Sequence, residues 1–379
     1  MDAVKKIMIY SRDPGAANCV IPVFQCLSKF SKYKIELIGK DFALKKYLDS
    51  GLEAKNLSEI ITNINYLSVK EFLKNKQYDL IFSGVGSDDL TDRLLWRAAK
   101  ELSIPTIVIL DQWLNYSKRF YFGASNEKID KSKMVVPNII CVMDDLAKKE
   151  MIKEGFDSKI LRVTGQPYFE LVLKRQTLIT KQDKQNILNH LGIKNGSYKI
   201  FFVSEPIVEF NKDSNYLGYD QFSILETLLN SLSLILKNDS KLKVDLVIKF
   251  HPRNNPDIFS NFIIKYQNIP RLKIILDKIS SPDLVLAIAD LLVGMSSALL
   301  LEAAILGKPF FSLQVGLKCE NPFMLSRIGM AKTILTQDEL VLSLNNFFGG
   351  KINKQNNFDL VRGSVIKIKQ VIDNILWSN

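Results

Sequence analysis

Apolar and polar positions along the chain alternate between two patterns from its first residues onward. Short, mainly apolar runs such as residues 6–10, 79–83 and 104–110 are followed by stretches whose apolar positions recur with the helical period. Strands that are apolar on both faces are typical of a parallel sheet covered by helices on both sides. The pattern therefore predicts repeated β-α units and an α/β fold.

The pattern is interrupted at Val163-Thr164-Gly165-Gln166-Pro167, where a Gly and a Pro end a strand before a new helix, and we interpret this segment as a hinge between domains. A second series of apolar runs follows, including residues 199–203, 245–250 and 291–294. Each series is typical of a doubly wound, Rossmann-like domain. The length of 379 residues also fits two domains of ordinary size. We predict three parts: an N-terminal domain over residues 1–168, a C-terminal domain over 169–350, and a C-terminal helix within 351–379 that packs back on the first domain.

Charge, hydropathy and cysteine spacing narrow the classes of partner. The net charge of +11 permits an anionic partner, but the lysines form no patch interleaved with aromatic residues, so we expect no nucleic-acid partner. No apolar run approaches the roughly 20 residues that cross a bilayer, which predicts a cytoplasmic protein. Peripheral contact with the anionic inner face of the membrane stays open. We expect no metal and no cofactor, because the cysteines are scattered, without C-x-x-C spacing or a neighbouring histidine: Cys19, Cys26, Cys141 and Cys319.

The loop after the first strand is the first candidate site, since open α/β sheets bind ligands beyond the carboxyl ends of their strands. The small residues of Ser11–Asn18 allow close approach of a ligand, and the helix that follows offers free N–H groups to an anion. We expect Asp13, Gly15 and Asn18 to bind a phosphate or a negatively charged sugar. The alternative is a tight turn in which Asp13 caps the helix.

Carboxylates follow two later strands of the first domain. Asp88 and Asp89 are adjacent at one strand end, and Asp111 closes the apolar strand 104–110. A carboxylate at such a position could deprotonate an acceptor hydroxyl, so all three are candidate general bases. Helix capping explains Asp88 or Asp89 equally well.

The strongest local signal of the second domain is Lys249-Phe250-His251-Pro252, directly after an apolar strand. Lys249 and His251 lie two residues apart, on the same face, and both can donate to phosphate oxygens. The chain contains only two histidines, which favours a functional role for His251. His190 lies in a polar helix and is interpreted as structural.

A second signal begins at Gly294, which ends a strand and is followed by Ser296 and Ser297 at the start of a helix. These two hydroxyls could hold a phosphate group at the helix N terminus. Glu302 on the same helix could accept hydrogen bonds from ribose hydroxyls, or it could be a capping or surface acid. Glu205, in the loop after the first strand of this domain, is a secondary catalytic candidate.

These motifs carry a resemblance to known families. Glu302-Ala303 followed by Gly307-Lys308-Pro309 resembles the nucleotide-binding helix of GT-B glycosyltransferases and of the UDP-N-acetylglucosamine 2-epimerases that share their fold. The pairs His251-Pro252 and Ser296-Ser297 are similar to the donor-phosphate motifs of bacterial sialyltransferases, polysialyltransferases and glycerophosphotransferases. The resemblance extends over residues 240–315 and implies a nucleotide-sugar donor on the C-terminal domain.

Two departures from these families bear on the chemistry. Sialyltransferase-type enzymes carry an acidic-acidic-Gly motif, whereas Asp88-Asp89 is followed here by Leu90. Epimerases carry a Glu-Ala-Gly-Leu-Arg stretch where this chain has Asp111-Gln112-Trp113-Leu114-Asn115, which argues against epimerase chemistry.

The sequence as a whole predicts the GT-B fold, two Rossmann-like domains facing across a cleft, and a metal-independent glycosyltransferase. Lys249, His251, Ser296 and Ser297 would stabilise the charge on the leaving nucleotide, and Asp111 or Asp88 would activate the acceptor. The preferred donor is a CMP-linked acidic sugar, with a UDP-sugar second, and the acceptor is a glycan, a lipid-linked molecule or a protein. The alternatives are a 2-epimerase-like enzyme or sugar-nucleotide hydrolase, and a non-catalytic nucleotide-sugar binding protein.

Overall fold

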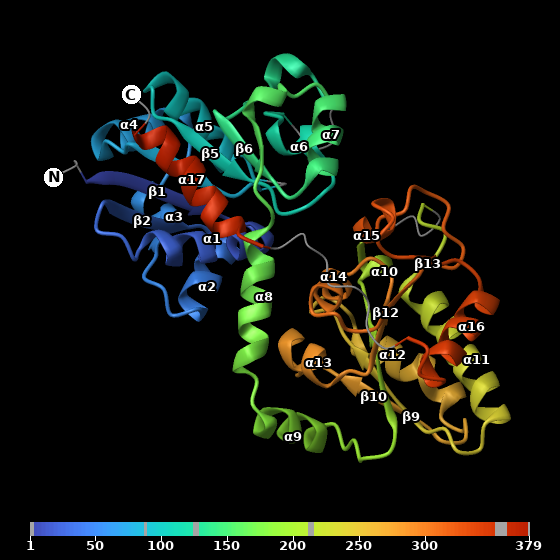
Figure 1. Cartoon of the computed structure of the whole chain (residues 1–379). Coiled ribbons are helices and arrows are strands. Elements are labelled where there is room, and N and C mark those ends of the chain that lie inside the picture. The colour runs from blue at the N-terminus through green and yellow to red at the C-terminus, as the bar shows by residue number, and fades with distance from the viewer. Residues whose placement is uncertain (1–3, 87–88, 124–128, 211–215, 353–361, 378–379) are drawn as a thin grey trace. The chain divides into compact units, whose positions relative to one another are not determined.

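The computed structural model describes residues 4–86, 89–123, 129–210, 216–352 and 362–377. The chain divides into two compact units (Figure 1). Unit 1 comprises Met1–Leu171 together with Asp359–Asn379, and unit 2 comprises Val172–Phe358. Each unit contains its own parallel sheet and its own apolar core.

The sheet of unit 1 has seven strands among the described residues, in the order β3-β2-β1-β4-β5-β6-β7, and all its pairs are parallel. The strand order reverses between β1 and β4, and in a doubly wound sheet such a reversal opens a crevice at the carboxyl ends of the two strands. The strands are β1 Lys5–Ser11, β2 Tyr33–Gly39, β3 Lys55–Asn56, β4 Leu80–Ser83, β5 Thr106–Ile109, β6 Ile139–Val142 and β7 Leu161–Val163.

The helices of unit 1 include one contributed by the C-terminal end of the chain. Helix α17 contacts α1, and Ile368 and Ile372 of α17 are fully buried in the core of unit 1. Figure 1 shows α17 in red beside the blue strands. The backbone N–H of Ser364 donates to Glu170 Oε1 at 2.6 Å, which anchors the start of α17. The helices are α1 Pro14–Leu27, α2 Asp41–Asp49, α3 Leu57–Ile60, α4 Tyr66–Lys76, α5 Thr91–Glu101, α6 Tyr116–Phe120, α7 Asp145–Lys153, α8 Pro167–Leu178, which continues into unit 2, and α17 Ser364–Trp377, with short 3-10 turns at Lys131–Lys133 and Ser158–Ile160.

The sheet of unit 2 has six strands in the described part of the chain, in the order β10-β9-β8-β11-β12-β13, again all parallel. Its order reverses between β8 and β11, which places a second crevice at their carboxyl ends. The strands are β8 Tyr198–Val203, β9 Val244–Lys249, β10 Leu272–Asp277, β11 Leu291–Gly294, β12 Phe310–Leu313 and β13 Thr333–Ile334.

The longest helix of unit 2 with described bounds, α11, buries an apolar stripe against the sheet and α16. Its N-cap Asp220 accepts hydrogen bonds from the N–H groups of Phe222 and Ser223, which satisfies two of the donors that a helix start leaves open. The helices are α9 Lys181–His190, α10 Ile207–Phe210, α11 Gln221–Asn238, α12 Pro256–Ile263, α13 Pro282–Ile288, α14 Ala298–Ile305, α15 Met324–Arg327 and α16 Gln337–Phe348, with a 3-10 turn at Ile264–Tyr266.

The α/β fold class predicted from the apolar runs is confirmed, because both units contain a parallel sheet flanked by helices. Within the described ranges, no helix combines the length and the apolar character that a membrane span requires.

Candidate functional site

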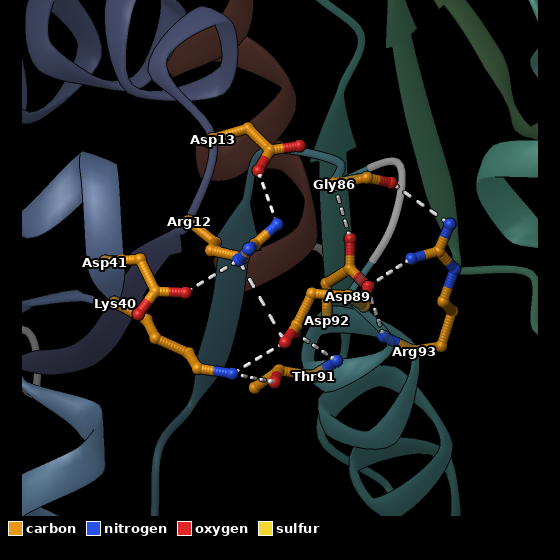
Figure 2. Close-up of polar contacts among 9 residues, drawn as sticks. All are labelled: Arg12, Asp13, Lys40, Asp41, Gly86, Asp89, Thr91, Asp92 and Arg93. Carbon is orange, nitrogen blue, oxygen red and sulfur yellow. Dashed lines mark hydrogen bonds and ion pairs between the residues drawn. The ribbon is translucent and has the colours of Figure 1, made fainter.

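A cluster of alternating charges lies at the carboxyl ends of β1, β2 and β4 in unit 1 (Figure 2). We call it the strand-end cluster, and its members are Arg12, Asp13, Lys40, Asp41, Gly86, Asp89, Thr91, Asp92 and Arg93. Arg12 joins two of its acids, because Nε donates to Asp41 Oδ2 at 2.8 Å and Nη1 to Asp13 Oδ1 at 3.0 Å. The cluster brings the sequence-predicted Asp13 and Asp89 to one edge of the sheet.

Both carboxylate oxygens of Asp89 accept hydrogen bonds within this cluster. Its Oδ1 accepts from the backbone N–H of Thr91 at 2.8 Å, and its Oδ2 accepts from Lys40 Nζ at 2.6 Å. Burial raises the pKa of the Asp89 carboxyl, but the hydrogen bonds from Lys40 and Thr91 outweigh it and hold the pKa below its usual value. These contacts favour the helix-start role that the sequence left open for Asp89. Asp88, its neighbour and the other candidate base, lies outside the described residues.

Asp92 is a buried carboxylate of the same cluster that sequence reasoning missed. Its Oδ2 accepts from the backbone N–H of Gly86 at 2.7 Å, and its Oδ1 accepts from Arg93 Nη1 at 3.0 Å. Burial raises the pKa of Asp92 to about 6, although the charge of Arg93 lowers it. A Cβ on Gly86 would lie 3.5 Å from Asp13 Oδ2 and 3.6 Å from Asp92 Oδ2, so these two carboxylates approach the same glycine. The residue is visible in the sequence as an acid of the first turn of α5, but its burial is a tertiary property.

Asp111, the preferred candidate base, lies just beyond β5 and is buried against α1. Arg119 Nη1 donates to Asp111 Oδ1 at 2.7 Å, and the two side chains are 8% and 7% exposed. Burial raises the pKa of the Asp111 carboxyl, whereas Arg119 lowers it. A Cβ on Gly15 would lie only 2.0 Å from Asp111 Oδ2, so the absence of a side chain at Gly15 lets the carboxylate reach the first turn of α1. Asn18 Oδ1 is buried, and the described residues offer it no hydrogen-bond partner.

Unit 2 contains a cavity of about 500 Å³ at the carboxyl ends of β8 and β9, which we call the β8–β9 cavity. The sequence-predicted Lys249, His251, Pro252 and Ser297 all line it. The lining residues with polar side chains that bear on ligand binding are Ser204, Lys249, His251, Lys278, Ser280 and Ser297. The cavity therefore combines cationic and hydroxyl groups at the strand ends.

Burial tunes the two basic groups that the sequence singled out. It lowers the pKa of the Lys249 amine, although Asp277, whose Oδ2 lies 3.8 Å from Lys249 Nζ, partly restores it. It also lowers the pKa of His251, and the charge of Arg253 lowers it further. His251 Nδ1 accepts from the backbone N–H of Arg253 at 3.2 Å, so a neutral imidazole carries its proton on Nε2. His251 is thereby prepared to donate a hydrogen bond from Nε2.

Two buried hydroxyl groups of the cavity lack a partner. Ser204 Oγ and Ser280 Oγ have no hydrogen-bond partner among the described residues. A buried polar group usually has a partner, and a bound ligand can supply one. Both hydroxyls belong to residues that line the β8–β9 cavity.

The start of α14 holds the remaining candidates. Ser296 is bound by the chain itself, because its N–H and its Oγ both donate to Glu205, at 2.7 and 2.8 Å. Ser297 caps α14 through a hydrogen bond from the N–H of Leu299 at 3.3 Å. Burial raises the pKa of Glu205, opposed by the donors of Ser296. Gly294 ends β11, and Glu302 is buried within α14.

Among the residues that the structure describes, no group of three or more His, Cys, Asp and Glu side chains is arranged to hold a metal ion. The strand-end cluster of unit 1 and the β8–β9 cavity of unit 2 each consist of hydrogen-bonding and charged groups.

Sequence comparison finds no matching protein-family model and no matching curated protein. Solved structures are similar in fold. UDP-GlcNAc 2-epimerase from Neisseria meningitidis, bound to UDP-GlcNAc, has a TM-score of 0.69 and 16% identity over 97% of this chain and 100% of that chain. The UDP-GlcNAc 2-epimerase from Methanocaldococcus jannaschii has a TM-score of 0.69 and 16% identity, over 97% of this chain and 99% of that chain.

A glycosyltransferase from Rickettsia africae ESF-5 is also similar, with a TM-score of 0.62 and 12% identity over the full length of both chains. These proteins share two Rossmann-like units in one chain, and identities this low establish the architecture alone. With its two parallel doubly wound sheets, this chain has the GT-B-like fold that UDP-GlcNAc 2-epimerases and glycosyltransferases share.

Proposed function

We propose that the protein is an enzyme that acts on a nucleotide-linked sugar and that the β8–β9 cavity binds the nucleotide. The observation that carries this proposal is the combination of Lys249, His251 and the unpartnered hydroxyls of Ser204 and Ser280 in one strand-end cavity. Phosphate and ribose oxygens would satisfy these donors. The cavity volume of about 500 Å³ falls within the ordinary range of small-molecule sites.

A UDP-sugar is the nucleotide sugar that the comparisons favour over the CMP-linked acidic sugar predicted from the sequence. The Neisseria enzyme was solved with UDP-GlcNAc, and the Methanocaldococcus enzyme with UDP-GlcNAc and UDP. CMP remains the second ligand to test, since the His-Pro and Ser-Ser pairs suggested it.

We propose epimerisation of the donor sugar, without an acceptor, as the first candidate reaction. A carbon next to the anomeric centre can be inverted when one group removes its proton as the C–H electron pair expels the nucleotide from the anomeric carbon, and another group returns a proton to the opposite face as the nucleotide adds back. Asp92, with its pKa raised to about 6, and Asp111, with its pKa also raised, are the buried carboxyl groups of unit 1 suited to such exchange. Several of the similar structures are 2-epimerases, which supports the same reaction.

Glycosyl transfer is the second candidate, and two observations favour it. The Rickettsia africae glycosyltransferase covers the full chain, and residues 111–115 depart from the Glu-Ala-Gly-Leu-Arg stretch of epimerases. In this reaction the same carboxyl groups would deprotonate an acceptor hydroxyl. Unlike epimerisation, transfer requires an acceptor.

The first test measures binding of UDP and CMP by calorimetry. Lys249→Met should weaken UDP binding by roughly 10- to 100-fold, as expected when a charge-assisted hydrogen bond is lost. Lys237→Met, at an exposed position near the end of α11, removes the same charge elsewhere in unit 2 and should change the affinity less than twofold. Equal effects of the two variants would contradict a nucleotide site at Lys249.

The second test separates the two reactions by incubating UDP-GlcNAc with the protein in D₂O and following it by NMR. Epimerisation predicts a second UDP-sugar that carries deuterium at the inverted carbon, with no acceptor present. Asp92→Asn should reduce this exchange at least tenfold. A donor that stays unchanged until a glycan or lipid acceptor is added would replace epimerisation by transfer.

A further inference from the structure

The amides of Met295 and Ser296, which directly precede Ser297, the N-cap of α14, are already occupied by a carboxylate of the chain itself. Glu205 Oε1 accepts from the backbone N–H of Met295 at 3.2 Å and from that of Ser296 at 2.7 Å. Glu205 Oε2 accepts from Ser296 Oγ at 2.8 Å. These amides lie just beyond the N terminus of α14, where the positive end of the helix dipole favours an anion. Glu205 therefore occupies donors that could otherwise bind a phosphate oxygen.

A second observation is that the β8–β9 cavity is lined by the direct chain neighbours of Glu205 and Ser296. Ser204, which directly precedes Glu205, is 2% exposed, and its hydroxyl has no hydrogen-bond partner among the described residues. Ser204 and Ser297, the N-cap of α14, both line the β8–β9 cavity. The cavity therefore extends to the N-cap of α14, and the residue next to Glu205 contributes a buried hydroxyl that has no partner in the described part of the chain.

We propose that Glu205 is a specificity-determining residue that competes with the nucleotide's phosphate for the amides at the start of α14. This inference rests on the proposed nucleotide binding and assigns a role to one residue of that site. A phosphate gains these donors only when the Glu205 carboxylate leaves them. Because of this competition, the negative charge of a phosphate adds less binding free energy than it would if the Glu205 carboxylate were absent.

The competition follows from hydrogen-bond capacity and from charge. Each backbone N–H has one proton to donate, so the N–H groups of Met295 and Ser296 cannot fully serve Glu205 and a phosphate together. A carboxylate next to a phosphate also repels it, and this repulsion is strong where water is excluded. Glutamine at this position keeps an acceptor for the amides but removes the charge.

A purely structural role for Glu205 makes a different prediction. If Glu205 only holds the loop after β8 to the start of α14, Glu205→Gln will alter the stability of the protein. It will then change the dissociation constants of ligands of different charge by the same factor. The measurement must therefore compare ligands that differ in phosphate number and in nothing else.

The experiment titrates the full-length wild-type protein and Glu205→Gln with uridine, UMP and UDP and takes the ratio of the two dissociation constants for each ligand. We expect a ratio near one for uridine, a larger ratio for UMP, and at least about tenfold tighter binding of UDP by the variant. Circular dichroism of the variant checks that it is folded. Glu209→Gln is the matched control, because Glu209 interacts electrostatically with His251 but does not contact α14 through any described hydrogen bond, and its ratios should stay below about threefold.

Three results would overturn the inference. Equal ratios for the three ligands would show that Glu205 does not compete with phosphate, while UDP binding by the wild type would leave the proposed function standing. Weaker UDP binding by Glu205→Gln would show that the carboxylate accepts a hydrogen bond from the ligand. If neither protein binds any of the three compounds, the proposed nucleotide site fails, and the inference fails with it.

Discussion

Replacing Gly15 with alanine tests the packing that holds the candidate acid Asp111 in place. The new Cβ would lie 2.0 Å from Asp111 Oδ2 and 3.1 Å from its Cγ, whereas ordinary contact begins near 3.4 Å. The carboxylate must therefore move by more than 1 Å, away from a position in which it is paired with Arg119 at 2.7 Å. Both partners are nearly buried, so there is no solvent into which either can swing.

The expected loss of stability follows from these contacts. Overpacking a dense interior costs about 1–3 kcal/mol, and breaking a buried ion pair completely costs about 3–5 kcal/mol. Alanine recovers up to about 1 kcal/mol relative to glycine in a helix. We expect Gly15→Ala to destabilise unit 1 by roughly 2–4 kcal/mol, with the ion pair strained but not lost.

Urea denaturation followed by tryptophan fluorescence measures this loss directly. All three tryptophans of the chain lie in unit 1: Trp96, Trp113 and Trp377. The same substitution is then made in Asp111→Ala, where the obstructing carboxylate is absent. In that background Gly15→Ala should be neutral or stabilising by up to about 1 kcal/mol, which gives a coupling free energy of about 2–5 kcal/mol.

Gly86→Ala, in the strand-end cluster of the same unit, is the matched control. Its Cβ would make only ordinary contacts, the nearest at 3.5 Å from Asp13 Oδ2, so it should cost less than about 1 kcal/mol. The reasoning is refuted if Gly15→Ala costs the same with and without the Asp111 carboxylate. A cost of Gly15→Ala no larger than that of Gly86→Ala would refute it as well.

Three further predictions concern stability. Burial raises the pKa of Asp92 from 3.8 to about 6, so between these pH values the folded state binds more protons than the unfolded state. The free energy of unfolding should therefore fall by roughly 3 kcal/mol as the pH rises through this window. Asp92→Asn should abolish that part of the pH dependence, as measured by urea denaturation at a series of pH values. Ile372→Ala, in the buried core, should lower the stability of unit 1 by about 2–5 kcal/mol. Ile366→Ala, at a residue 53% exposed on the same helix, should change it by less than about 0.5 kcal/mol. Equal effects of the two substitutions would contradict the packing of α17. In unit 2, Gly218 and Gly196 both have positive φ, but a Cβ on Gly218 would lie 2.0 Å from the Gly316 carbonyl oxygen, whereas a Cβ on Gly196 would meet open space. Thermal denaturation followed by circular dichroism should therefore show a larger loss of stability for Gly218→Ala than for Gly196→Ala.

The sequence identified the strand-end residues of unit 2 because their signal is local. Lys249 ends the strand β9, His251 lies two residues beyond it, and Ser297 caps the helix after β11. The order of elements along the chain therefore places all three at the carboxyl edge of one sheet. The sequence could not show that the hydroxyls of Ser204 and Ser280 are buried and have no partner among the described residues, because burial depends on elements distant in the sequence.

The three candidate acids of unit 1 also separate what the sequence shows from what only the tertiary structure decides. Asp89, Asp92 and Asp111 are all visible in the sequence as carboxylates near strand ends. Their chemistry differs because Lys40 and Thr91 hold the pKa of Asp89 down, whereas burial raises that of Asp92 and Asp111. Sequence reasoning selected Asp89 and passed over Asp92, since it had no access to desolvation or to a partner 49 residues away.

The sequence by itself determined the α/β class, the parallel sheets and the positions of the strand-end loops, because apolar periodicity and Gly or Pro punctuation act over a few residues. Only the tertiary structure decided that Glu205 occupies the amides at the start of α14, 91 residues further along the chain at Ser296, and that Asp111 presses against Gly15. Such pairings arise when strands far apart in sequence become neighbours in one sheet, and the free energies of burial and charge are set there rather than by local order.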